Sequence, residues 1–130
     1  MKKKFSLSWK SSKQPRKQRK YRYNAPIHIK MKFVNVHLSK ELRSKYKKRS
    51  IGLKSGDKVQ IMRGQYRSKT GKVEKINIKK SRVYITGLEV IKKDGTKTLF
   101  SFNPSNLVII ELNIDDKQRQ RILNRKIGGK

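Results

Sequence analysis

The chain has 130 residues, of which 37 are lysine or arginine and 8 are aspartate or glutamate, so its formal net charge is +29 at pH 7. Such a charge favours a polyanionic partner and opposes compaction in its absence. Cysteine is absent, which excludes disulfides, a zinc ribbon and thiol chemistry.

Charge and apolar residues are unevenly distributed. Residues 1–50 carry 18 basic groups and one acid, residues 51–114 carry 13 and five, and residues 115–130 carry six and two. Regularly spaced apolar residues are concentrated in the middle. We therefore expect one domain at 51–114, a basic N-terminal extension at 1–50, and a basic C-terminal helix and tail at 115–130. No apolar run approaches the ~20 residues of a membrane span, and we expect neither a span nor a secretory signal.

In residues 1–23, cations alternate with aromatic residues, without helical or strand periodicity, and Pro15 interrupts the segment. One interpretation is a disordered, solvated tail. The other is an arm ordered by phosphate contacts, with aromatic rings stacked on unpaired bases. Because residues 1–22 hold ten basic groups and no acid, we expect them to be disordered in the free protein and ordered on RNA.

The rest of the extension contains two short elements. The alternating run Ile27–Phe33 predicts an extended segment. Ser39 is a suitable N-cap for a helix at residues 40–46, with Glu41 near the positive end of the helix dipole. The two histidines, His28 and His37, have no nearby partners in the sequence for a metal site or a catalytic pair, so we expect both to be structural.

A hairpin is predicted at the centre of the chain. Lys58–Ile61 and Lys72–Ile76 both alternate apolar and polar residues, the period of half-buried strands. Glycines at both ends of the connecting loop, Gly64 and Gly71, indicate positive φ or close approach of another backbone.

The loop of this hairpin is polar apart from Tyr66. Arg67 and Lys69 are two residues apart, so an extended loop would place them on one side, able to reach adjacent phosphates. Tyr66 would then face the opposite side, toward either the fold or RNA. The alternative is a solvated turn with incidental charge.

Further strands are predicted after a cationic turn at Asn77–Ser81. The expected segments are a strand at 82–86, a bend at Gly87, strands at 88–92 and 96–102 joined by the Asp94–Gly95 turn, a turn at 104–106, and a strand at 107–112. Five or six short strands indicate a mainly β fold and a small barrel, either SH3-like or OB-like. The residues expected to point inward are Val59, Ile61, Val73, Ile76, Val83, Ile85 and Val108.

The C-terminal segment predicts a short helix capped by Asp115–Asp116, with Gln118 reaching back toward Asp115. Ile122 and Leu123 are expected to pack on the barrel. The eight acids of the chain are scattered, apart from the pair Asp115–Asp116. No glycine loop of the phosphate-binding kind is present, and no serine has a histidine or acid positioned to activate it as a nucleophile. We therefore expect no enzyme activity, cofactor, metal or small-molecule substrate.

The pattern Val59-x-Ile61-Met62-x-Gly64, followed by Gly71-x-Val73-x-x-Ile76, resembles the KOW motif of ribosomal proteins and NusG-like transcription factors. Other stretches resemble, in order, the archaeal/eukaryotic L24 family of large-subunit ribosomal proteins. They are Ser12–Lys20, Tyr23–Pro26, Leu38–Arg43, Pro104–Asn106 and Asp115–Lys117. The resemblance covers nearly the whole chain, and Ser68 stands where that family often has glycine.

The resemblance implies an SH3-like KOW barrel and a structural constituent of the large ribosomal subunit in the cytoplasm. Its implied partners are large-subunit rRNA, near the 5′ part, and neighbouring ribosomal proteins. It further implies early assembly and a position close to the nascent-chain tunnel exit. Two alternatives stay open: a transcription elongation module whose barrel contacts protein, and an architectural DNA-binding protein.

On the RNA hypothesis, affinity comes mainly from lysine and arginine contacts to phosphates, and specificity from RNA shape and stacked bases. The candidate RNA-binding residues are Lys10, Lys13, Arg16, Lys17, Arg19, Lys20, Tyr21, Arg22, Tyr23, Asn24, Arg43, Lys47, Lys48, Arg49, Arg63, Gly64, Tyr66, Arg67, Lys69, Lys79, Lys80, Arg82, Ser105, Asn106, Arg119 and Arg121.

Overall fold

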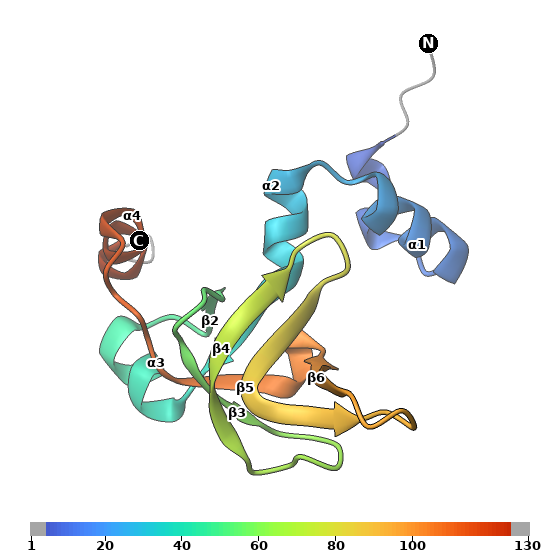
Figure 1. Ribbon diagram of the computed structural model, residues 1–130. Helices are drawn as coiled ribbons and strands as arrows, with labels where there is room; N and C mark the ends of the chain where they lie inside the picture. The colour runs from blue at the N-terminus through green and yellow to red at the C-terminus, as the bar shows by residue number, and fades with distance from the viewer. Residues whose placement is uncertain (1–4, 126–130) are drawn as a thin grey trace.

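The computed structural model describes residues 5–125, and a mixed β-sheet dominates them (Figure 1). The elements are η1 (Leu7–Ser11), α1 (Pro15–Asn24), α2 (Ile27–Lys30), η2 (Met31–Val34), β1 (Asn35–Leu38), α3 (Lys40–Tyr46), β2 (Ser50–Gly52), β3 (Lys58–Ile61), β4 (Thr70–Asn77), β5 (Arg82–Ile91), β6 (Lys97–Phe102), η3 (Pro104–Asn106), β7 (Leu107–Glu111) and α4 (Lys117–Asn124). The expected mainly β class is confirmed.

The seven strands lie in the order β2-β1-β7-β3-β4-β5-β6. Strands β1 and β7 run parallel, and the other neighbours are antiparallel. No ladder joins β6 to β2 within residues 5–125, so strand pairing leaves the sheet open there. The pairing shifts register within β4 and β5, where Gly87 at φ +80° allows the long strand β5 to bend.

The central hairpin is β3–β4, as the alternating pattern predicts. Val59 and Ile61 are buried, and Val59 lies opposite Gly71. A Cβ at Gly71 would collide with the Ile85 side chain, which explains the need for glycine by close approach. Gly64 has φ +93°, so the predicted positive φ is confirmed there, whereas the closest neighbour of Gly71 is a side chain and not the predicted backbone.

The predicted inward orientation is confirmed for five residues, all of them buried: Val59, Ile61, Val73, Val83 and Ile85. Ile76 is half-buried and packs against the same core. For Val108 the expectation is wrong, because Leu107 and Ile109 are the fully buried residues of β7. The run Leu107–Ile110 is apolar throughout, so the sequence pattern does not show which of its residues point inward.

The sheet begins earlier in the chain than Ile51, because β1 pairs with both β2 and β7. The extended segment predicted for Ile27–Phe33 is wrong: these residues are helical in α2 and η2, and the strand starts at Asn35. Val36 and Leu38 are the buried positions of β1. Their alternation is as regular as that of the preceding segment, so only tertiary packing distinguishes the two.

Residues 7–34 of the N-terminal arm are also largely helical, although the sequence pattern indicated no helix there. Pro15 does not interrupt a helix; it occupies the first turn of α1, where its missing N–H costs nothing. The helix ends at Asn24, and its C-cap Ala25 leaves the helical conformation because Pro26 follows. A small apolar cluster separate from the main core holds the arm together, comprising Tyr21, Ala25 and Ile29 with Phe5, Trp9 and Phe33 around them.

The remaining predictions of local structure are largely confirmed. Ser39 caps α3 by accepting a hydrogen bond from the backbone N–H of Leu42. The turn around Gly95 joins β5 to β6. At α4, Asp116 is the N-cap and accepts from the backbone N–H of Gln118. The predicted return bond from the Gln118 side chain to Asp115 is absent among the described contacts, because Gln118 lies one residue too early for a capping box.

Candidate nucleic-acid interface

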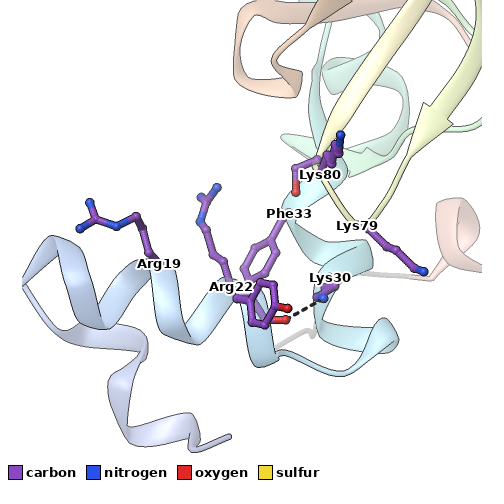
Figure 2. A pocket seen from close by; sticks show the side chains of 8 residues that line it. Arg19, Arg22, Lys30, Phe33, Lys79 and Lys80 are labelled. Carbon is purple, nitrogen blue, oxygen red and sulfur yellow. Dashed lines mark hydrogen bonds between the residues drawn. The ribbon is translucent and has the colours of Figure 1, made fainter. Parts of the chain in front are cut away.

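A cationic pocket lies where the N-terminal helices meet the β4–β5 turn (Figure 2). It has a volume of about 230 Å³. The lining residues are Arg19, Arg22 and Tyr23 of α1, Lys30 and Phe33 of α2 and η2, and Lys79, Lys80 and Ser81 of the turn. The N-terminal helices and the distant β4–β5 turn thus place five cations around one hollow, which we call the arm pocket.

Aromatic and backbone contacts fix several of the arm-pocket side chains. The guanidinium of Arg22 lies 5.0 Å from the ring centroid of Phe33. Phe33 in turn packs edge-on against Tyr21, with ring centroids 6.0 Å apart. Lys30 Nζ donates a hydrogen bond of 2.9 Å to the carbonyl oxygen of Tyr23. These contacts hold positive charge in place before any ligand arrives.

The β4–β5 turn is ordered as well. The backbone N–H of Lys80 donates to Asn77 Oδ1 at 3.0 Å, and Ser81 adopts a left-handed conformation with φ 50°. No acid lines the arm pocket. Because its ammonium and guanidinium groups only donate hydrogen bonds, the arrangement suits an anion rich in acceptors, such as a phosphodiester.

The β3–β4 loop forms a second cationic surface, but it is not extended. Its backbone turns twice, with the N–H of Arg67 donating to Gly64 O and the N–H of Lys69 donating to Tyr66 O. The two-residue spacing of Arg67 and Lys69 therefore does not place them on one side in the way an extended loop would. Both are exposed, as is Arg63, and Lys69 Nζ lies 5.3 Å from the ring centroid of Tyr66.

Tyr66 faces the fold rather than solvent. Its ring contacts Phe100 and Phe102, with centroids 5.1 and 5.7 Å away, and its hydroxyl donates to Glu89 O. Asn106 O accepts the backbone N–H of Met62, which brings η3 against the start of the loop. The structure therefore brings the predicted residues of η3 and the β3–β4 loop together.

The other residues predicted to contact RNA are scattered over the surface. Along η1, α1 and the segment between them, exposed cations are Lys10, Lys13, Arg16, Lys17 and Lys20, and Asn24 is half-buried. Arg82, Ser105 and Arg121 are exposed on β5, η3 and α4. Near α3, Lys47 and Arg49 are exposed, whereas Arg43 donates to Leu38 O and Lys48 donates to Ile122 O.

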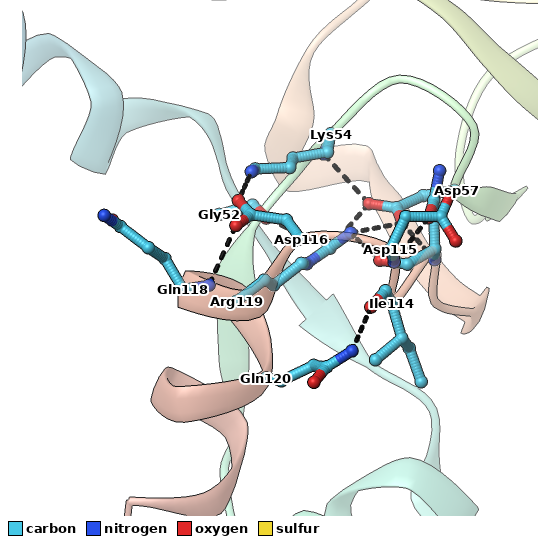
Figure 3. A network of polar contacts seen from close by, with 10 residues as sticks. Gly52, Lys54, Asp57, Ile114, Asp115, Asp116, Gln118, Arg119 and Gln120 are labelled. Atoms are coloured by element: carbon cyan, nitrogen blue, oxygen red, sulfur yellow. Dashed lines mark hydrogen bonds and ion pairs between the residues drawn. The ribbon is translucent and has the colours of Figure 1, made fainter.

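Arg119 is a correction to the predicted set, because its side chain is only 3% exposed (Figure 3). Its two terminal nitrogens donate to Asp57 Oδ1 at 2.6 Å and Oδ2 at 2.7 Å. The same guanidinium donates to Asn113 O and Gly52 O. Arg119 thus anchors α4 to the sheet and is not available to a phosphate.

Tyr21 is a second correction, since it is 5% exposed and lies inside the arm's apolar cluster. Its ring packs 5.2 Å from that of Phe5, so stacking on RNA would require the cluster to open. Tyr23, two residues later on the same helix, is 82% exposed. The helical periodicity of α1, which sequence reasoning did not detect, separates the two tyrosines.

Sequence reasoning missed three arm-pocket residues, Lys30, Phe33 and Ser81. Lys30 and Phe33 fell in the segment predicted to be extended. The sequence did predict the cationic turn at Asn77–Ser81, but the position of this turn beside the N-terminal helices depends on tertiary structure. Nothing in the local pattern of Ser81 indicates its left-handed backbone.

Few acidic side chains form ion pairs with the surface lysines and arginines. Lys54 and Asp116 form an exposed ion pair, and Lys58 Nζ lies 2.9 Å from Glu111 Oε1. The hydrogen bond from Lys54, followed by that from the backbone N–H of Gln118, lowers the pKa of Asp116 below its ordinary value. Asp116 therefore stays ionised, as the cap of α4, to a lower pH than an ordinary aspartate.

Among residues 5–125, no helix is long and apolar enough to cross a membrane. The range also contains no group of three or more histidines and acids placed to hold a metal ion.

Comparison with known proteins gives consistent matches. Residues 12–126 match the family model described as ribosomal proteins L26 of eukaryotes and L24 of archaea. The large ribosomal subunit protein uL24 of Methanosphaera stadtmanae is 45% identical over 116 residues, 89% of this chain and 99% of the relative. The uL24 proteins of Methanothrix thermoacetophila and Korarchaeum cryptofilum are 43% and 44% identical over 114 and 115 residues, each covering 88% of this chain and 98% and 88% of the relative.

Proposed function

Because the chain belongs to the family of eukaryotic L26 and archaeal L24 ribosomal proteins, we propose that it is a structural, non-enzymatic constituent of the large ribosomal subunit in the cytoplasm. It binds large-subunit rRNA and contacts neighbouring ribosomal proteins. The observation that carries the proposal is the match over nearly the whole chain to relatives named as proteins of that subunit.

The charge distribution supports binding through phosphates. Arginine and lysine dominate α1, the arm pocket and the β3–β4 loop, whereas Asp57 is neutralised by Arg119 inside the fold. Each phosphate that the protein neutralises releases bound counterions, so affinity falls as salt rises. Folded RNA supplies the specificity through its shape and its unpaired bases.

Two finer assignments belong to the same proposal. The strands from β2 to β7 form a KOW-type variant of the SH3-like barrel; the bend in β5 and the register shifts of β4 and β5 support this by curving the sheet. Residues 1–50 act as an RNA-binding extension that also contributes strand β1 to the sheet, and residues 115–130 act as a basic C-terminal segment. Early assembly and a place near the tunnel exit complete the proposal.

The direct experiment combines sedimentation with filter retention. Large subunits of Methanosphaera stadtmanae stripped by a high-salt wash should take up the protein. In filter retention at matched salt, large-subunit rRNA should compete better than duplex DNA, with a slope of log affinity against log salt of ~0.7–0.9 per phosphate contact. Equal retention of rRNA and DNA, with no uptake by the subunits, would favour an architectural DNA-binding protein instead.

A further inference from the structure

We propose that the arm pocket binds a single unpaired nucleotide of the RNA, holding its phosphate with Arg19, Lys79 and Lys80 and stacking its base on Tyr23. This inference rests on the proposed function, since it names the element of RNA that one part of the basic surface recognises. Duplex RNA and acidic protein surfaces are the rival occupants.

The position of the arm pocket favours one residue of a polymer. Its volume of about 230 Å³ is below the roughly 300–1,000 Å³ of sites that enclose a whole small molecule, so it suits part of a nucleotide, such as its phosphate, with the base lying outside. It is formed by α1, by η2 and by the β4–β5 turn, and Figure 2 shows Arg19 and Arg22 projecting from the same side of α1. A strand of RNA can therefore insert one nucleotide here and continue over the cationic helix.

The donors of the arm pocket divide into two groups. Arg22 and Lys30 are already engaged, by the Phe33 ring and by the carbonyl oxygen of Tyr23. The side chains of Arg19, Lys79 and Lys80 donate to no acceptor within residues 5–125 and are exposed. These three charges are thus free to meet phosphate oxygens, and the two engaged ones keep the surroundings positive.

Tyr23 distinguishes a nucleotide from a bare anion. The other aromatic side chains of the arm, Phe5, Trp9, Tyr21 and Phe33, pack into the apolar cluster, whereas Tyr23 is 82% exposed and still lines the pocket. Its backbone is fixed by α1 and by the hydrogen bond from Lys30. An ordered, exposed ring beside phosphate-binding cations is suited to stack on an unpaired base, which a duplex does not offer.

The test uses the full chain and fluorescence anisotropy with two labelled probes, a single-stranded oligouridylate and an RNA duplex with the same number of phosphates. Tyr23→Leu should weaken binding of oligouridylate by ~5- to 150-fold, the loss expected for one base–aromatic stack. Binding of the duplex should be unchanged. Tyr23→Phe retains the ring and should bind both probes as the wild type does.

A second part of the test removes charge and compares two double variants. The first combines Lys79→Gln and Lys80→Gln, and the control combines the same replacements at Lys92 and Lys93. The second pair lies in the exposed β5–β6 turn and removes equal charge. The arm-pocket pair should weaken oligouridylate binding more than the control pair. Thermal unfolding of each variant checks that the fold is intact, as expected for exposed residues.

The outcomes are distinct from those that test the proposed function. If the wild type retains large-subunit rRNA but Tyr23→Leu binds oligouridylate normally, the arm-pocket proposal is overturned and the ribosomal function stands. An equal reduction in binding of both probes, no oligouridylate binding by the wild type, or equal competition by polyglutamate would overturn it too. If the wild type fails to prefer rRNA over DNA, it is the proposed function that fails.

Discussion

Asp57 joins three segments of the chain through one carboxylate. It accepts hydrogen bonds from the backbone N–H of Lys54 and Asn113, and it pairs with both terminal nitrogens of Arg119. The carboxylate is completely buried, and its charge is tolerable there because each oxygen has donors. This one residue fixes the β2–β3 loop and the position of α4.

Replacing Arg119 with Met should lower the free energy of unfolding by ~3–5 kcal/mol, because it leaves the Asp57 carboxylate buried without its countercharge. Arg121→Met is the matched control: it changes the same charge on the same helix at an exposed position and should shift stability by less than about 0.5 kcal/mol. Urea unfolding of the two variants gives the comparison. Similar midpoints for both would show that Arg119 does not stabilise the fold through Asp57.

Ser68 destabilises the fold through the conformation of its backbone. Its φ of 68° is left-handed, and its backbone N–H donates to Ile61 O at 2.8 Å, so the loop imposes this conformation. A residue with a Cβ pays roughly 1–2 kcal/mol in that region, whereas glycine does not. The family resemblance pointed to this position because the family often has glycine there.

Ser68→Gly should therefore stabilise the protein by ~0.5–1 kcal/mol, the relief of strain less the entropy cost of glycine in the unfolded chain. Ser44→Gly, within α3, is the control and should destabilise by a similar amount. Thermal unfolding measures both changes. A decrease in the stability of Ser68→Gly would mean that the serine side chain contributes more than the backbone strain costs.

At the scale of single elements, the β3–β4 hairpin shows what alternation can reveal. Lys58–Ile61 alternates cleanly, and its buried face follows directly from the pattern. The loop between the strands is different: Gly64 marked its start, but the two consecutive turns depend on hydrogen bonds that the sequence does not specify. Prediction of the strands succeeded for this reason, and prediction of an extended loop did not.

The loop's exposed cations give a prediction about function. Arg67→Glu with Lys69→Glu should leave the fold intact and weaken rRNA binding by more than Lys92→Glu with Lys93→Glu. Both pairs are exposed loop residues with the same change in charge, but the first pair belongs to the proposed RNA-facing loop. Filter retention at two salt concentrations measures the difference. Equal weakening by the two pairs would mean that total charge alone matters and that the loop has no dedicated role.

The helices illustrate the opposite case. In α1, cations occupy half of the ten positions, and the apolar side that packs inward is reduced to a few residues. A hydrophobic period is not visible in such a segment, so the sequence predicted a tail. The prediction that Arg119 binds RNA is wrong for a related reason. Its partner Asp57 is 62 residues away, and the local sequence shows only another arginine in a basic helix.

At the scale of the whole molecule, residues 5–125 form two separate apolar clusters. The main core fills the sheet, whereas the arm's cluster has three buried residues, Tyr21, Ala25 and Ile29. So small a core is marginal, since units below ≈ 40 residues rarely fold without additional support. The sheet should therefore keep its stability when the first part of the arm is removed.

Deletion of residues 1–22 should leave the thermal midpoint of the sheet nearly unchanged and weaken rRNA binding. It removes ten basic groups, so the slope of log affinity against log salt should flatten by ~0.7–0.9 for each phosphate that the shortened protein no longer neutralises. Calorimetry and filter retention measure the two effects. A large fall in the midpoint would show that the arm supports the main core, and an unchanged salt slope would show that it does not bind RNA.

The most direct test of the account is lysine acetylation of the protein, free and within the large ribosomal subunit, with modified residues located by mass spectrometry. Lys79 and Lys80 are exposed in the free protein and line the arm pocket. If that pocket faces rRNA, both should react readily in the free protein and be protected in the subunit. Equal reactivity of the two lysines in both states would contradict the assignment of this surface to RNA.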